Sequence, residues 1–181
     1  MSRPSLIRRL LMLRNLELFN IFWLPVCLYI ALVSRNVLHW QSYVYGMFLI
    51  CIVLAQAVLY LHLKLKTIYK TGTAFPAYFH ALFSFFKWAD VTLLFIYPLL
   101  VFGNQVSPLV NFQASIWANL LFLFAALEYT NYYHYQLSHD NLNALRYLLK
   151  HRKIRRSALF MDLQRDQNAS ESRDEPDPFS K

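Results

Sequence analysis

The sequence predicts an all-α integral membrane protein, a bundle of four transmembrane helices with its N- and C-termini in the cytoplasm. Two observations lead to this fold class. Four apolar segments are each about long enough to cross a bilayer as a helix, namely residues 16–33, 43–61, 82–102 and 114–135. Apart from Arg35 and Lys87, all of the 18 Lys and Arg residues fall in segments that this topology places on one side of the membrane. By the positive-inside rule, that side is the cytoplasm.

The composition excludes a soluble domain, because 57% of the residues are hydrophobic and 17% are aromatic. The net charge of +8 could indicate a nucleic-acid-binding protein. However, the basic residues flank apolar segments and do not form a patch on a soluble module. Basic clusters beside membrane helices are typical of proteins that contact anionic lipid. We therefore expect anionic lipids of the inner leaflet as partners and no nucleic acid, and the compact loops favour a bacterial plasma membrane.

The chain begins with a basic segment that precedes the first predicted span. Residues 1–15 mix leucine and isoleucine with four arginines, a pattern typical of a short helix at the membrane interface. The first span contains Pro25, which a membrane helix tolerates and which usually produces a kink. An outer loop with Trp40 as an interface anchor leads to the second span, and a cytoplasmic basic loop follows it.

The third and fourth spans complete a transmembrane domain that we assign to residues 16–135. The third span carries Pro98, and the outer loop after it has no charged residue. This loop, residues 103–113, is short and contains glycine, asparagine and proline, so it is expected to turn tightly. The fourth span should therefore pack beside the third.

Two cytoplasmic segments follow the fourth span. Leucines recur at helical spacing in residues 136–163 beside a run of basic residues, which predicts an amphipathic helix on the inner leaflet. Residues 164–181 are rich in Asp, Glu, Ser and Pro, which predicts disorder. The residues expected to bind lipid are Arg146, Lys150, Arg152, Lys153, Arg155 and Arg156.

Each predicted span carries a strongly polar side chain at a similar depth. At a rise of 1.5 Å per residue, these side chains lie roughly 18–25 Å below the outer boundary, in the inner half of the membrane. We add Tyr135, which shares a helix face with Glu128, although an aromatic belt at the inner interface already explains the tyrosines of this region. The predicted polar layer consists of Asn20, Gln56, Lys87, Asp90, Glu128, Asn131 and Tyr135.

The polar layer has two interpretations. In the first, its side chains form hydrogen bonds that hold the helices together within the lipid. In the second, Asp90 and Glu128 form a carboxylate pair that faces the cytoplasm and takes an ion, a proton or a polar ligand. Lys87 is either the counter-ion of this pair or extends to the inner interface, which would leave the carboxylates without one.

No sequence motif in the chain is typical of a particular enzymatic reaction. The histidines lack the spacings of metal enzymes, so we expect no metal and no cofactor. The first functional hypothesis is an accessory or interaction subunit of the plasma membrane, which acts through a membrane protein partner or as a homo-oligomer. The alternative is a transporter or a proton or ion conduit that uses the carboxylate pair. A third hypothesis is a membrane enzyme that acts on lipid with Glu128 and His134 as acid or base.

Overall fold

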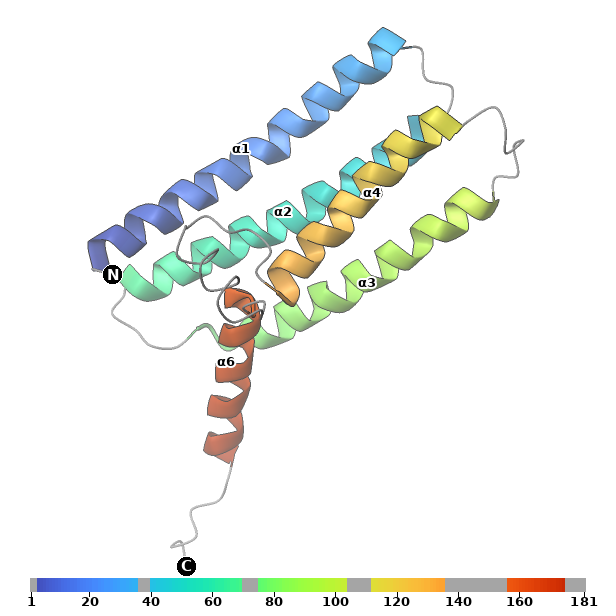
Figure 1. Ribbon diagram of the computed structural model, residues 1–181. Coiled ribbons are helices and arrows are strands. Elements are labelled where there is room, and N and C mark those ends of the chain that lie inside the picture. The colour runs from blue at the N-terminus through green and yellow to red at the C-terminus, as the bar shows by residue number, and fades with distance from the viewer. Residues whose placement is uncertain (1–2, 36–39, 70–74, 104–111, 136–155, 175–181) are drawn as a thin grey trace, which may run out of the picture.

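The described part of the protein belongs to the all-α class, as the sequence predicts (Figure 1). The computed structural model describes residues 3–35, 40–69, 75–103, 112–135 and 156–174. The described residues form the helices α1 (Arg3–Arg35), α2 (Trp40–Tyr69), α3 (Phe79–Gly103), α4 (Phe112–Tyr133) and α6 (Ala158–Asp174). Helices α1 to α4 form an antiparallel bundle, and α6 starts at the end of the bundle where α1 begins (Figure 1).

Among the described residues, three helices are long and apolar enough to cross a membrane. The candidate spans are Arg3–Val33, Gln41–Tyr69 and Phe79–Leu99. The fourth predicted span, which corresponds to α4, is not one of them. Its last two turns carry Glu128, Asn131 and several tyrosines, which lower its mean hydropathy. The composition of the helices therefore supports a membrane location, but it does not confirm a four-span topology.

Helices α1 and α2 are longer than a bilayer requires. At 1.5 Å per residue, the 33 residues of α1 extend about 50 Å, and the 30 residues of α2 extend about 45 Å. The hydrocarbon core is only about 30 Å thick. Residues 1–15, which the sequence analysis treats as a separate interfacial segment, continue into the first span as one helix from Arg3. The helix continues through both parts, although Pro25 lies inside it and offers no N–H to the Ile21 carbonyl, which Cys51 Sγ of α2 approaches to 3.9 Å.

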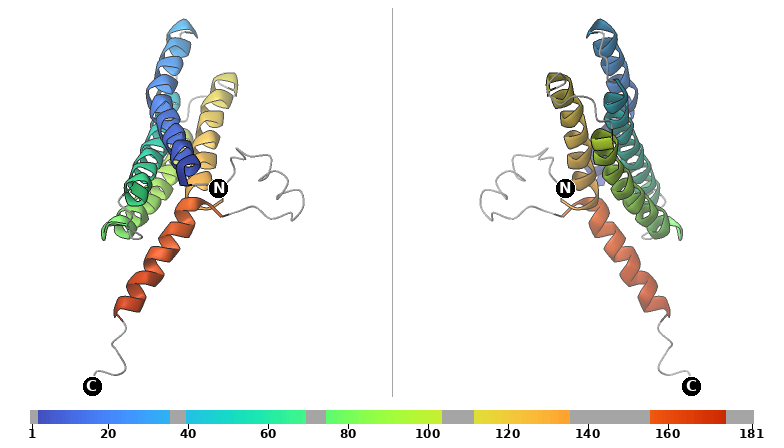
Figure 2. Two further views of the ribbon diagram at one scale, coloured as in Figure 1. Left: turned by 90° about the vertical axis from the view of Figure 1, so that its left-hand side faces the viewer. Right: turned by 90° about the vertical axis from the view of Figure 1, so that its right-hand side faces the viewer.

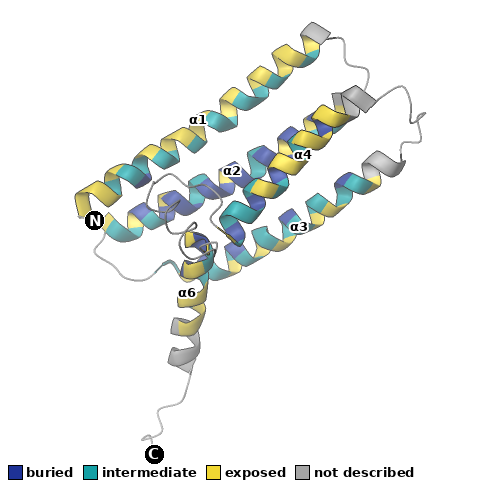
Figure 3. Ribbon diagram, in the orientation of Figure 1, coloured by how far each residue is buried: buried dark blue, intermediate teal, exposed yellow. Residues whose placement is uncertain are grey.

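Helix α2 is the central helix of the bundle. It packs against α1, α3 and α4, and it has the most continuous band of buried residues (Figure 3). Gly46 allows α4 to approach closely, because a Cβ atom at this position would lie 3.1 Å from Cβ of Leu121. By contrast, none of the apolar window of α1 is buried inside the protein.

The buried side chains form two clusters. The smaller cluster joins Leu49, Ile50 and Leu54 of α2 to Ala125 of α4. The larger cluster extends to the other end of the bundle and includes Leu10, Tyr60, Leu61, Leu63, Leu65, Phe79, Phe83 and Leu159. Three of the four largest fully buried side chains, Tyr133, Phe79 and Phe83, belong to this cluster.

We call the end of the molecule that holds most of the larger cluster the cap. It comprises residues 3–15, 57–69, 75–86 and 156–174, so it combines the extensions of α1, α2 and α3 with α6. An aromatic stack forms part of its interior, with ring centroids 4.1 Å apart for Phe75 and Phe79 and 5.0 Å apart for Phe79 and Phe83. The interior of the cap is therefore packed, and it is continuous with the bundle through Tyr129 and Tyr133 of α4.

Helix α6 is held at its start by the end of α4. The backbones of Tyr135 and Arg156 pair in an isolated β-bridge, and the Ser157 amide donates to the His134 carbonyl at 3.1 Å. Ser157 also caps α6, since its Oγ accepts a hydrogen bond from the amide of Phe160 at 3.1 Å. From this point α6 extends away from the bundle (Figure 2).

Residues 164–174 of the segment for which the sequence predicts disorder belong to α6, which continues to Asp174. Its capped and docked first turns provide the nucleus, from which the polar second half extends at little further cost. Residues 175–181 lie outside the described residues. So do residues 136–155, which make up most of the predicted basic helix.

The outward faces of α1, α3 and α4 are apolar. Each exposes large hydrophobic side chains at helical spacing, which a soluble monomer rarely does. Examples are Phe22, Trp23, Tyr29, Ile30, Phe85, Trp88, Phe95, Leu99, Trp117 and Leu123. These faces are suited to contact with lipid chains.

Candidate functional site

A hydrogen-bonded chain of three side chains connects α4, α2 and α3 in the interior. The Tyr133 hydroxyl donates to Gln56 Oε1 at 2.7 Å, and Gln56 Nε2 donates to Asp90 Oδ1 at 2.9 Å. All three residues are buried, and Asp90 is only 2% exposed. The structure therefore brings together two residues of the predicted polar layer, Gln56 and Asp90, with one residue that the prediction omits. We call Gln56, Asp90 and Tyr133 the polar triad.

One oxygen atom of the polar triad lacks a partner. In the part of the chain that the structure describes, Asp90 Oδ2 is the buried side-chain polar atom that forms no hydrogen bond. Lys87 lies one turn away on α3, but no ion pair within the described residues joins it to Asp90 or Glu128. Tyr129, which lies one turn before Tyr133, is close enough to interact electrostatically with the Asp90 carboxylate. The carboxyl group thus lies between neutral side chains of α2 and α4.

Glu128 lies on a different face of α4 from Tyr129 and Tyr133. It accepts a hydrogen bond from Asn131 and lies near Glu17 of α1. Glu17 in turn accepts a hydrogen bond from the Tyr132 hydroxyl at 2.6 Å. This side of α4 therefore faces α1, whereas the triad side faces α2 and α3. Within the described residues, Asp90 and Glu128 make no direct contact with each other.

Two other residues of the predicted layer lie apart from the polar triad. Asn20 is partly buried on α1, and within the described residues it makes no hydrogen bond to the triad. Tyr135 lies beyond the end of α4, is 48% exposed and pairs through its backbone with Arg156. A count of depth along each helix gives the level of a side chain, but it does not show which neighbour the side chain faces.

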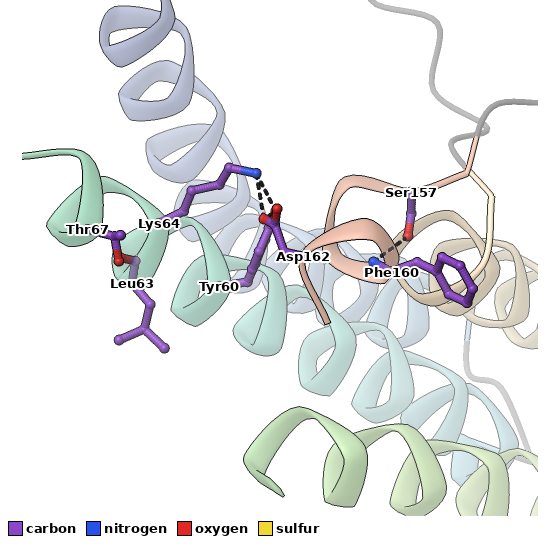
Figure 4. A network of polar contacts seen from close by, with 7 residues as sticks. All are labelled: Tyr60, Leu63, Lys64, Thr67, Ser157, Phe160 and Asp162. Carbon is purple, nitrogen blue, oxygen red and sulfur yellow. Dashed lines mark hydrogen bonds and ion pairs between the residues drawn. The ribbon is translucent and has the colours of Figure 1, made fainter. Parts of the chain in front are cut away.

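A second polar group lies on α2, closer to its C-terminal end. Lys64 Nζ and the Tyr60 hydroxyl each contact Asp162 Oδ2 of α6 at 2.6 Å (Figure 4). Lys64 Nζ also donates to the Tyr60 hydroxyl at 2.8 Å and lies 5.2 Å from the centroid of its ring. We call Tyr60, Lys64 and Asp162 the clasp, because they fasten α6 to the bundle.

The clasp is shielded from solvent. The side chains of Lys64 and Asp162 are 24% and 11% exposed, so their ion pair is screened less than a surface pair. Gln56, Tyr60 and Lys64 recur every four residues and therefore lie along one face of α2. This polar stripe runs from the triad to the clasp.

His134 lies at the junction of α4 and α6. Its carbonyl accepts the hydrogen bond from Ser157, and its Nε2 lies 3.4 Å from the Tyr129 hydroxyl. Burial lowers the pKa of His134, and the positive charge of Lys87 lowers this pKa further. The folded protein therefore favours the neutral imidazole more than the unfolded chain does.

Basic side chains surround the cap. Arg156 is exposed, and its guanidinium carbon lies 4.9 Å from the centroid of the Phe160 ring. Arg3 ties the start of α1 to the end of α2 through a hydrogen bond of 2.6 Å to the Ile68 carbonyl. The other predicted lipid-binding residues lie outside the described residues, namely Arg146, Lys150, Arg152, Lys153 and Arg155.

The chain matches no protein-family model, and no curated protein or solved structure is significantly similar to it. Within the described residues, no group of three or more His, Cys, Asp or Glu side chains is arranged to hold a metal ion. The two polar groups, the triad and the clasp, are therefore the features from which a function can be argued.

Proposed function

We propose that the chain is a small polytopic plasma-membrane protein that acts as an accessory or interaction subunit. In this proposal, four helices cross the bilayer and the cap lies at the cytoplasmic face, where α6 is presented to a partner. The observation that carries the proposal is the clasp. It holds α6 to α2 through a shielded ion pair, while the exposed residues beyond Asp162 extend away from the bundle (Figures 1 and 2).

The arrangement of α4 supports its role as the fourth span. It packs along α2 and contacts α3, and its 22 residues extend about 33 Å, which is enough to cross the hydrocarbon core. Its polar last turns lie near the cap, where the inner interface would begin. Tyrosines and polar side chains are typical of that level of a transmembrane helix.

The charges of the cap support its cytoplasmic orientation. Arg3, Arg8, Lys66 and Arg165 are exposed at this end of the molecule, as the positive-inside rule expects for the cytoplasmic side. The basic residues between Arg146 and Arg156 would add to this charge and bring the cap into contact with anionic lipids.

The construction of α6 supports a role in interaction. Its first turns are fixed by Ser157, Leu159 and Asp162, whereas Gln164, Arg165 and Asn168 beyond them are exposed and polar. A helix whose base is rigidly held and whose tip stays outside the core presents its side chains in a defined position. Such preorganisation reduces the entropy that a partner would lose on binding.

Site-specific photo-crosslinking tests the interaction role in cells. A photoreactive residue at Gln164 should give a discrete protein adduct, and its yield should fall severalfold when Asp162→Asn breaks the clasp. The reversed pair, Lys64→Asp with Asp162→Lys, should restore the yield. The control is the same photoreactive residue at the exposed Phe22 of α1, where the yield of adduct should not depend on the clasp. Equal yields with an intact and a broken clasp would contradict the proposal.

A further inference from the structure

We propose that Asp90 is a proton-binding site and that one exchangeable proton occupies its Oδ2 within the bundle. This inference concerns the interior of the helices and goes beyond the interaction role of α6. It rests on the geometry of the polar triad. Asp90 Oδ1 is held by Gln56 Nε2 at 2.9 Å, whereas Oδ2 has no hydrogen-bond partner among the described residues.

The neighbours of Asp90 do not include a positive charge that could balance an ionised carboxylate. Gln56 of α2 and Tyr129 and Tyr133 of α4 are neutral groups. On α3 itself, Lys87 forms no ion pair with Asp90 in the described part of the chain. The ammonium group of α2 that lies beyond the triad, on Lys64, is already paired with Asp162 of α6.

An unpaired charge in this position would be costly. Moving an ionised carboxylate from water into a medium of low polarity carries a large penalty, which is removed if the group takes up a proton and becomes neutral. With a 2% exposed side chain, Asp90 cannot recover the lost hydration from bulk water. Binding of the proton converts the carboxylate to a carboxylic acid, and no other reactant is needed.

The triad selects a proton over a metal cation. Hard cations in proteins take about six or more oxygen ligands. Here Asp90 Oδ1 and Gln56 Oε1 are both engaged in hydrogen bonds, which leaves Oδ2 as the free oxygen of the pair. A single free carboxylate oxygen is sufficient for a proton. Gln56 and Tyr133 act as positioning residues, because their hydrogen bonds fix Oδ1 and thereby direct the proton to Oδ2.

Infrared difference spectroscopy on the full chain in lipid vesicles tests this site over about pH 5 to 9. The carbonyl band of a protonated carboxyl group should be present in the wild type near neutral pH and absent in Asp90→Asn. Glu128→Gln is the matched control, because Glu128 is half-buried on the other face of α4, and the band of Asp90 should remain in this variant. Tyr133→Phe should shift the band, since it changes the hydrogen bonding of Gln56.

A second measurement does not depend on the folding of a variant. Incorporation of aspartate labelled with heavy carbon in its carboxyl group should shift the same band in the wild-type chain, whereas labelled glutamate should not. A carboxylic acid band that responds to labelled aspartate and to Asp90→Asn supports the proton-binding site. The absence of a protonated aspartate band near neutral pH would overturn it, because Asp90 would then be ionised.

Discussion

Tyr133 is the last residue of α4, and its hydroxyl is the first donor in the chain that leads to Asp90. Its ring is almost completely buried, so it contributes both to the core and to the hydrogen bonding of Gln56. Residues with this double role are difficult to recognise in a sequence. A tyrosine at the end of a span is equally compatible with an aromatic belt, which is how the sequence analysis explains this region.

Replacement of Tyr133 by phenylalanine should destabilise the protein. The variant keeps the ring but leaves Gln56 Oε1 without its donor in a buried position, at a cost of about 1–3 kcal/mol. Chemical unfolding in detergent measures this loss. Tyr29→Phe, at a site that is 69% exposed, should stay within about 0.5 kcal/mol of the wild type. Equal stabilities of the two variants would show that the triad hydrogen bond contributes nothing.

The partly buried His134 predicts a loss of stability in acid. Because the fold lowers the pKa of His134, the unfolded chain binds the proton more tightly than the folded chain. The stabilisation is therefore complete above the ordinary histidine pKa of about 6.5 and is lost as the pH falls below it. Melting temperatures between about pH 8 and pH 5 should fall more steeply for the wild type than for His134→Gln.

The exposed His62 provides the matched control for this measurement. His62→Gln should keep the acid sensitivity of the wild type, because the imidazole at the junction of α4 and α6 is unchanged. The explanation would fail if His134→Gln retained the full pH dependence.

At the scale of elements, the clasp couples α6 to α2. We expect Asp162→Asn to leave Lys64 without its counter-ion and to release α6 before the rest of the bundle unfolds. Hydrogen exchange should therefore show early loss of protection in α6, while α2 and α4 stay protected. Asp166→Asn, on the same helix but outside the clasp, is the control. Uniform loss of protection in all helices would contradict a local role.

A double-mutant cycle measures the strength of the clasp. Lys64→Met, Asp162→Asn and the combined variant should give an interaction energy of about 0.5–3 kcal/mol, as for other residues in direct contact. Additive effects of the two substitutions would show that the ion pair makes no net contribution.

Helix formation could largely be predicted from the sequence, whereas the pairing of the polar residues could not. Apolar runs and flanking charges locate α1 to α4, because burial and membrane insertion act on whole segments. The contact between Lys64 and Asp162 joins residues 98 positions apart. Asp162 also precedes a strongly polar stretch, which local composition describes as disordered. Its order depends on Ser157 and on docking against the cap, and both are tertiary features.

For the candidate site too, the sequence predicts the position of the polar residues along each helix but not which of them contact one another. Depth counting places Gln56 and Asp90 at one level, and the structure brings them into contact. The same count also places Glu128 there, but Glu128 faces α1. The rotation of a helix about its axis is determined by packing against its neighbours, here by Gly46 and Leu121 at the contact of α2 and α4.

For the whole molecule, the proposed membrane location, with basic residues at the end that holds the cap, predicts dependence on lipid charge. Replacing Arg152, Lys153, Arg155 and Arg156 by glutamine should weaken binding of the chain to anionic lipid by roughly 1 kcal/mol for each charge close to the surface. The stabilisation of the full chain by anionic over zwitterionic lipid in nanodiscs measures the change. Arg35→Gln, at the opposite end of α1, should have no comparable effect. An unchanged lipid preference of the fourfold variant would refute lipid contact.

The central claim is that four helices cross the membrane and that the cap is cytoplasmic. It is tested most directly by labelling single cysteines at Gln41 and Gln164 with an impermeant thiol reagent, in a chain whose Cys27 and Cys51 are replaced by serine. In intact cells, where the reagent reaches only the outer face of the plasma membrane, the cysteine at position 41 should react. The cysteine at position 164 should react only after the membrane is permeabilised. Labelling of position 164 from outside would contradict the account: together with labelling of position 41 it would mean that α4 does not cross the bilayer, and without it that the orientation is inverted.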